Sequence, residues 1–177
     1  SRESIDMINM ILQYSKTSAA VLNKEPVEME ALVTEVFSEL RLGYPDRDIR
    51  LAIETSLPRV NVDRILFRQL LQNVISNSMK FTSVREKAII TVGCTITQDH
   101  YVFYIRDNGI GFDMKYSGKL FGLFQRLHTS DEFEGSGIGL VTVKKIIEKH
   151  DGKVWIEGKV DEGATVYFTL PLEASAR

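Results

Sequence analysis

The hydrophobic pattern begins with a helix. Apolar residues recur at helical spacing from Ile5 through Leu12 to Tyr14, and the small polar residues that follow weaken the pattern. Pro26 then interrupts helical geometry, because a proline disfavours that geometry in the residue before it. A second amphipathic helix is expected over residues 27–40.

Alternating apolar and polar residues predict strands further along the chain. The stretches with this pattern are 49–53, 60–62, 88–96, 101–106, 154–157 and 164–170. Asp63 is expected to cap a helix over 64–81, and Gly152 to end another over 139–150. Strands grouped around a few helices, without regular alternation, predict an α+β sandwich in which helices cover one face of a single mixed sheet.

Composition permits one full domain with a short appendage. The 177 residues are 44% apolar and 26% charged, and the boundary is expected between residues 24 and 25. Interspersed charges with a net charge of −2 exclude a basic nucleic-acid footprint. The single cysteine, Cys94, fits a reducing compartment, and no stretch reaches the roughly 20 apolar residues that cross a bilayer. A cytoplasmic domain is expected, whether its parent protein is soluble or membrane-anchored.

The helix over 64–81 carries Asn73, Asn77 and Lys80 at spacings of four and three, which places them along one line. Taken alone, this pattern is better explained by a solvated helix face that also includes Arg68, Gln72 and Ser76. Asparagine is a poor helix former, however, so its repetition favours a use for the amide oxygens. Amide oxygens suit Mg²⁺, and a lysine one turn on suits the phosphates that share the ion.

Two glycine-rich segments follow. Asp107 directly follows a strand, and the glycines after it permit a tight turn close to a ligand, although Asp-Asn-Gly is also common in ordinary turns. Gly135, Gly137 and Gly139 open the next helix, where free N–H groups favour phosphate. The segment is neither a Walker loop, because no Gly-Lys-Ser/Thr follows, nor a dinucleotide fingerprint, because no clear strand precedes it.

In this order, the three elements resemble the N box, G1 box and G2 box of the GHKL superfamily, in the form found in sensor histidine kinases of the phytochrome-like subgroup. Residues 120–128, Leu-Phe-Gly-Leu-Phe-Gln-Arg-Leu-His, resemble the F box of that subgroup, and 152–157 with 162–171 resemble its closing hairpin. The resemblance covers 25–172 and implies the two-layer α/β sandwich of the Bergerat type.

The resemblance also implies a site for ATP and Mg²⁺. Asp107 would accept a hydrogen bond from the adenine amino group, with Gly109 and Gly111 lining the base pocket. Asn77 and Asn73 would hold Mg²⁺ against the triphosphate, and which of the two dominates stays open. The expected reaction is phosphoryl transfer, in which positioning and charge stabilisation matter more than a protein nucleophile.

Further roles follow from the same resemblance. Lys80 would meet phosphate, Phe81 would close the base side of the pocket, and Arg126 would steady the γ-phosphate or the docked phosphoacceptor. Asn73, Lys80 and Arg126 would thus act in catalysis, beneath a lid formed by 114–134. The residues expected to contact nucleotide at the start of the last helix are Gly135, Ser136, Gly137, Ile138, Gly139 and Leu140.

The phosphate acceptor in the resembled family is a histidine followed by an acid, on a dimerisation helix that would precede residue 1. We therefore expect this chain not to autophosphorylate alone. His100 and His128 lack a following acid, and His150, which precedes Asp151, is interpreted as a surface helix terminus.

The resemblance also implies partners. Residues 1–24 would be the C-terminal part of the second dimerisation helix with its linker, and 25–177 the catalytic ATP-binding domain. The expected partners are the dimerisation and histidine-phosphotransfer domain of the same or the partner subunit and a response-regulator receiver domain, in a homodimeric parent protein. No nucleic-acid partner is expected.

Two other functions are weighed against the kinase. A degenerate kinase could use the domain as a nucleotide-binding interaction module, but the joint presence of Asp107, both asparagines, Lys80 and all three glycines of the G2 box counts against it. An ATPase of the gyrase or chaperone type would need a general-base glutamate one turn before the metal asparagine. Asn73 occupies that position, which disfavours hydrolysis.

Overall fold

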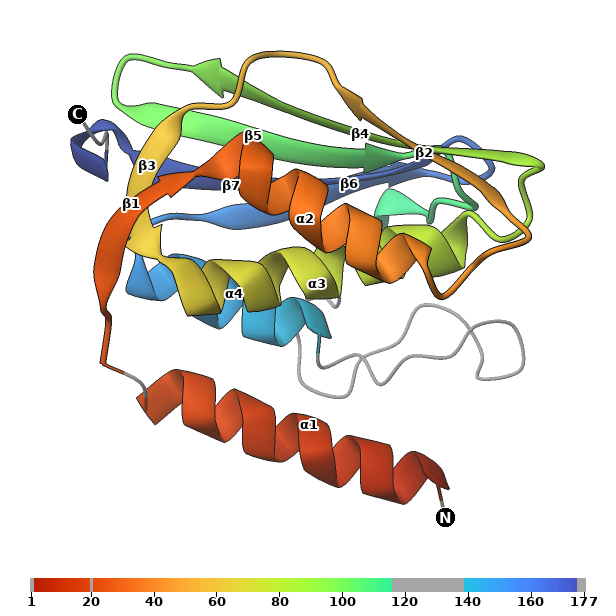
Figure 1. Cartoon of the computed structure of the whole chain (residues 1–177), viewed down its shortest axis with the longest axis horizontal. Coiled ribbons are helices and arrows are strands. Elements are labelled where there is room, and N and C mark those ends of the chain that lie inside the picture. The colour runs from red at the N-terminus through yellow and green to blue at the C-terminus, as the bar shows by residue number, and fades with distance from the viewer. Residues whose placement is uncertain (1, 20, 116–138, 175–177) are drawn as a thin grey trace.

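A five-stranded sheet forms one layer of the protein, and helices cover one of its faces (Figure 1). The structure is a computed structural model that describes residues 2–19, 21–115 and 139–174. None of the helices in these ranges is both long and apolar enough to cross a bilayer.

The strands of the sheet are β2 (Asp48–Ile53), β4 (Lys87–Ile96), β5 (His100–Asp107), β6 (Val154–Lys159) and β7 (Gly163–Pro171). The helices on its covered face are α2 (Met29–Arg41), α3 (Arg64–Phe81) and α4 (Gly139–Lys149), and the 3-10 helix η2 spans Leu172–Ala174. In the order β2-β4-β5-β7-β6, the β2–β4 pair is parallel and the other neighbours are antiparallel. The predicted α+β sandwich with a mixed sheet is confirmed.

Helix α1 (Arg2–Ala19) lies beyond α4, on the side away from the sheet (Figure 1). It continues past Tyr14, where the sequence pattern weakens, and the buried Thr17 hydroxyl in its last turns contacts α3. The apolar positions that predict this helix are open, since Ile5 is 59% and Leu12 54% exposed. The apolar face of α1 is therefore not buried against the described part of the domain.

The chain after α1 forms a strand that the sequence analysis missed. Strand β1 (Lys24–Glu28) pairs antiparallel with β3 (Arg59–Asp63), and Val27 faces Val60 in this ribbon. The helix expected from residue 27 begins at Met29 instead. Of the five residues of β1, Val27 alone is buried. The strand therefore shows no alternation of apolar and polar positions that would predict it.

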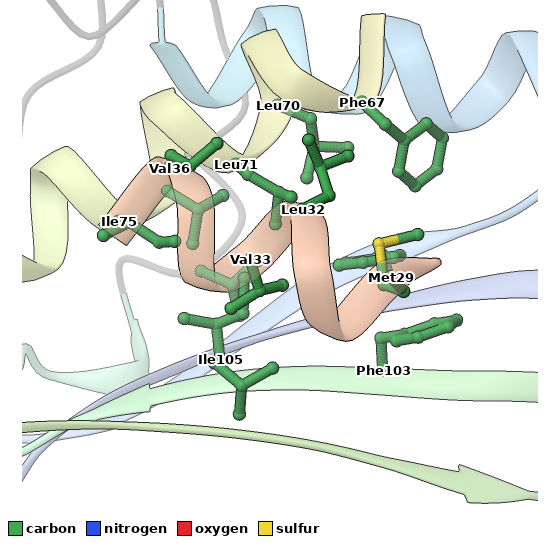
Figure 2. Close-up of a cluster of buried hydrophobic side chains, with 14 of the residues drawn as sticks. Met29, Leu32, Val33, Val36, Phe67, Leu70, Leu71, Ile75, Phe103 and Ile105 are labelled. Atoms are coloured by element: carbon green, nitrogen blue, oxygen red, sulfur yellow. The ribbon is translucent and has the colours of Figure 1, made fainter. Parts of the chain in front are cut away.

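The core is formed by apolar residues on one face of each helix and on alternate positions of β5. Figure 2 shows side chains from α2, α3 and β5 directed toward one another: Met29, Leu32, Val33, Val36, Phe67, Leu70, Leu71, Ile75, Phe103 and Ile105. Packing of this kind holds the apolar face of α3 against α2 and the sheet. Asn73 and Asn77 lie off this face and are half-buried on the side of α4.

His150 corrects the expectation of a surface helix terminus, because it is only 3% exposed. Its Nε2 accepts a hydrogen bond from the Asp63 N–H (3.1 Å), and its Nδ1–H donates to the Ile146 carbonyl (2.8 Å). Its ring meets Phe67 edge-on, with 4.8 Å between centroids. Burial lowers the pKa of His150, so the neutral imidazole joins the end of α4 to the start of α3.

Asp63 confirms the predicted cap of α3. Its Oδ1 accepts from the Leu66 N–H (3.1 Å), and its Oδ2 accepts from the Asn23 N–H (3.0 Å). One carboxylate therefore caps the helix that carries the asparagines and also fixes the segment that leads in from α1.

The buried imidazole makes stability depend on pH. A histidine whose pKa is lowered by folding contributes stability that is complete above its unfolded value of 6.5 and is lost as the pH falls toward the folded value. When the pH is lowered from 7.5 to 5.5, the unfolding free energy measured with urea should therefore change less favourably in the unmodified chain than in His150→Gln. The exposed His100 supplies the control, since the unfolding free energy of His100→Gln should change as much as that of the unmodified chain. Equal changes in all three proteins would contradict this account.

Candidate nucleotide site

Asp107 ends β5 with its carboxylate inside the protein. The residue is 6% exposed, and its Oδ1 accepts from the backbone N–H groups of Gly109 (2.8 Å) and Ala164 (3.3 Å). The buried Ser78, on α3, also hydrogen-bonds to the carboxylate. Burial raises the pKa of Asp107 to about 6, and the three hydrogen bonds act in the opposite direction.

No lysine or arginine in the described ranges pairs with Asp107. Its hydrogen-bond donors among the described residues are therefore all neutral, and a pKa of about 6 leaves the carboxyl group mostly ionised at pH 7.5. Such a group is suited to accept a hydrogen bond from a neutral N–H donor on a ligand.

The turn after Asp107 lies against the C-terminal end of α3. A Cβ on Gly109 would lie 2.4 Å from the Phe81 carbonyl oxygen and 2.9 Å from Oδ1 of Asp107. The Ile110 N–H donates to the same Phe81 carbonyl, at 3.1 Å. The structure therefore brings together Phe81 and Asp107, both of which the resemblance places at the base pocket.

The glycines of this region are packed by protein backbone. Gly111 has a φ of +64°, and a Cβ there would lie 1.9 Å from the Lys159 carbonyl oxygen. Gly163, which the sequence analysis did not single out, has a φ of +113° and would place a Cβ 2.0 Å from the Asp107 carbonyl oxygen. Both positions require glycine because the β6–β7 turn closes directly on the turn after β5.

The two asparagines face the start of α4. The Asn73 Nδ2 donates to the Gly139 carbonyl (3.4 Å), and a Cβ on Gly139 would lie 3.8 Å from the Asn77 Nδ2. Over the described ranges, no group of three or more His, Cys, Asp or Glu side chains could hold a metal ion. The amide oxygens of Asn73 and Asn77 fit a hard cation that takes its other ligands from phosphate and water.

Lys80 is half-buried near the end of α3, one turn after Asn77. No acidic side chain in the described parts of the chain pairs with it. Leu140 packs partly buried against the core, so its side chain has a structural role. The other predicted ligands lie outside the described residues: Arg126, Gly135, Ser136, Gly137 and Ile138. The F box and nearly all of the predicted lid lie outside them too.

Sequence reasoning missed two groups that hold Asp107. Ser78 follows the buried Val74 by four residues and Ile75 by three, so a polar residue on an apolar helix face was the available signal. The Ala164 N–H had no signal, because a backbone donor leaves no trace in residue type.

The chain belongs to the histidine kinase-, DNA gyrase B- and HSP90-like ATPase family, whose pattern matches residues 62–174. The match begins just before α3 and ends beyond β7, so it includes every described residue of the candidate site. This family membership identifies the domain as the ATP-binding part of such proteins.

Relatives with similar sequences are histidine kinases and phytochromes. Cyanobacterial phytochrome A of Nostoc sp. (strain PCC 7120) is 38% identical over 171 residues, which are 97% of this chain and 22% of that protein. The methanogenesis regulatory histidine kinase FilI of Methanothrix harundinacea is 37% identical over 160 residues, 90% of this chain and 18% of that protein. The chain thus spans about a fifth of the length of these relatives.

Solved structures share the fold. Full-length ShkA in complex with AMPPNP matches with a TM-score of 0.78 and 26% identity, over 97% of this chain and 36% of that one. The catalytic domain of the histidine kinase ThkA matches with a TM-score of 0.70 and 23% identity, over 87% of this chain and 99% of that domain. The match to an isolated catalytic domain agrees with the two-layer architecture described above.

The raised pKa of Asp107 predicts that this residue destabilises the free protein. Between the ordinary value of 3.8 and about 6, the folded chain keeps a proton that the unfolded chain has released, so stability falls as the pH rises through this window. At pH 7.5, Asp107→Asn should raise the unfolding free energy by up to about 3 kcal/mol, measured by urea denaturation. Asp48→Asn, which alters a more exposed carboxylate, is the matched control. A less stable Asp107→Asn protein would contradict the prediction.

Proposed function

We propose that this chain is the catalytic ATP-binding domain of a sensor histidine kinase and that it transfers the γ-phosphate of ATP to a histidine outside residues 1–177. The observation that carries the proposal is the buried Asp107 carboxylate, which is held by neutral donors beside α3. Its unmet acceptor capacity matches the amino group of adenine, whereas guanine carries a carbonyl at that position.

The other end of the nucleotide would meet the same helix. Ser78 contacts Asp107, and the preceding residue, Asn77, faces the start of α4 with Asn73, so α3 spans from the base to the phosphates. Mg²⁺ would neutralise charge on the phosphates, held by the amide oxygens of Asn73 and Asn77. Lys80 would bind a phosphate oxygen from the following turn.

The remaining roles rest on the family and on the sequence. Backbone N–H groups from Gly135 to Leu140 would bind phosphate at the start of α4, and Arg126 would steady the γ-phosphate or the phosphoacceptor. We assign 1–24 to the end of a dimerisation helix and its linker, and 25–177 to the catalytic domain. The partners would be the histidine-bearing dimerisation domain of a homodimeric cytoplasmic parent and a receiver domain.

Nucleotide titration tests the site. An ATP analogue should bind the unmodified chain at pH 7.5 in the presence of Mg²⁺, and bind at least about tenfold more weakly to Asp107→Asn, because a charge-assisted hydrogen bond contributes about 1.5–3 kcal/mol. Asp48→Asn should bind as the unmodified chain does. Removing Mg²⁺ or introducing Asn77→Ala should also weaken binding. If the affinity depended neither on Mg²⁺ nor on Asp107, the assignment of the nucleotide site would be wrong.

A phosphotransfer assay with a histidine acceptor distinguishes a kinase from a nucleotide-dependent interaction module. The dimerisation helices of a relative, with their histidine, would be supplied together with this chain and labelled ATP. A kinase domain should produce phosphate that is labile to acid and stable to base. Bound ATP without such a product would favour the interaction module.

A further inference from the structure

Arg85, in the loop between α3 and β4, donates hydrogen bonds to three main-chain carbonyls. Its Nε lies 2.7 Å from the Asn108 oxygen, and its Nη2 lies 3.1 Å from the Gly109 oxygen and 2.6 Å from the Asp161 oxygen. No acidic side chain of the described residues pairs with Arg85. Its charge is therefore met by carbonyl dipoles of the turn after β5 and of the β6–β7 turn.

Two of these carbonyls belong to peptide planes whose N–H groups donate to Asp107 and to the Phe81 carbonyl, beside the candidate base pocket. The plane that contains the Asn108 carbonyl also contains the Gly109 N–H, which donates to Oδ1 of Asp107 at 2.8 Å. In a planar trans peptide the C=O and N–H point in opposite directions. Arg85 and Asp107 therefore hold opposite sides of one peptide unit.

The next peptide plane has the same arrangement. Its Gly109 carbonyl accepts from Arg85, and its Ile110 N–H donates to the Phe81 carbonyl at 3.1 Å. Arg85 thus fixes two successive planes, one directed at Asp107 and one at the end of α3. Without Arg85 each plane would be held by its N–H alone, and the two carbonyls would lose the side-chain donor that fixes the other side of the plane.

No side chain of residues 108–111 donates to these two carbonyls. Gly109 and Gly111 have no side chains, and the Asn108 side chain is used on β4, where it accepts from the Ile89 N–H (2.9 Å) and donates to the Lys87 carbonyl (2.9 Å). A guanidinium presents several donors in one plane and reaches carbonyls from two segments, whereas a lysine ammonium is a single point. The position therefore requires arginine and not merely a positive charge.

We propose that Arg85 is a positioning residue of the adenine pocket, which aligns the Gly109 N–H with Asp107 and thereby sets the preference for adenine. This inference rests on the proposed function, in which Asp107 receives the adenine amino group. Arg85 itself need not touch the nucleotide.

The test compares the dissociation constants of an ATP analogue and a GTP analogue in the whole 177-residue chain. Arg85→Met and Arg85→Lys should weaken the ATP analogue by about tenfold or more, while the GTP analogue changes much less, so that the preference for adenine falls. A purely structural defect would lower the population of folded chain and weaken both analogues by the same factor. Arg50→Met is the matched control, because among the described residues this exposed arginine forms an ion pair with the neighbouring Asp48 alone.

A double-mutant cycle adds a second measurement. If Arg85 acts through Asp107, Arg85→Lys should have little further effect on ATP affinity in the Asp107→Asn background, whereas independent contributions would add. Arg85→Lys keeps the charge if Arg85→Met fails to fold. An unchanged adenine preference in Arg85→Lys, or additivity in the cycle, would overturn the inference about Arg85. The proposed function fails separately, if the unmodified chain and Asp107→Asn bind ATP alike.

Discussion

The burial of one carboxylate at the end of β5 is the constraint on which the site depends. Asp107 receives hydrogen bonds from Gly109, Ala164 and Ser78, but these neutral donors offset only part of the lost hydration, so its pKa stays raised at about 6. A cation beside it would remove this penalty and would also consume the acceptor. The fold instead keeps a destabilising charge in place, as expected where a ligand supplies the missing donor.

Helix α3 connects this carboxylate to the rest of the site. Its apolar face packs against α2 and the sheet (Figure 2), while Ser78 meets Asp107 and the asparagines meet the start of α4. Asp63 caps one end of the helix, and the Phe81 carbonyl at the other end receives the Ile110 N–H. Core packing thus sets the separation between the base end and the phosphate end of the proposed pocket, and Arg85 holds the turn that completes the base end.

The sequence predicted those parts of this arrangement that depend on residues close together in the chain. The period of α3, its Asp63 cap and the β4–β5 hairpin followed from residues close together in the chain. Strand β1 was missed because it buries a single residue, and His150 was misplaced because its partner, the Asp63 N–H, is 87 residues away. The Ala164 N–H and the carbonyls around Arg85 could not be predicted, since main-chain groups that meet across the fold have no signature in residue type. The order of the boxes nevertheless indicated the family, because it depends on residue types at fixed positions.

The central claim is that Asp107 is a buried, uncompensated acceptor that a nucleotide completes. The most direct measurement is the pKa of its carboxyl group, followed by ¹³C NMR of the labelled chain with and without an ATP analogue, with Asp107→Asn used to assign the signal. The account predicts a pKa near 6 in the free protein and a clear fall when the nucleotide binds, because an added donor favours the charged form. A pKa near 3.8 that does not respond to nucleotide would contradict it.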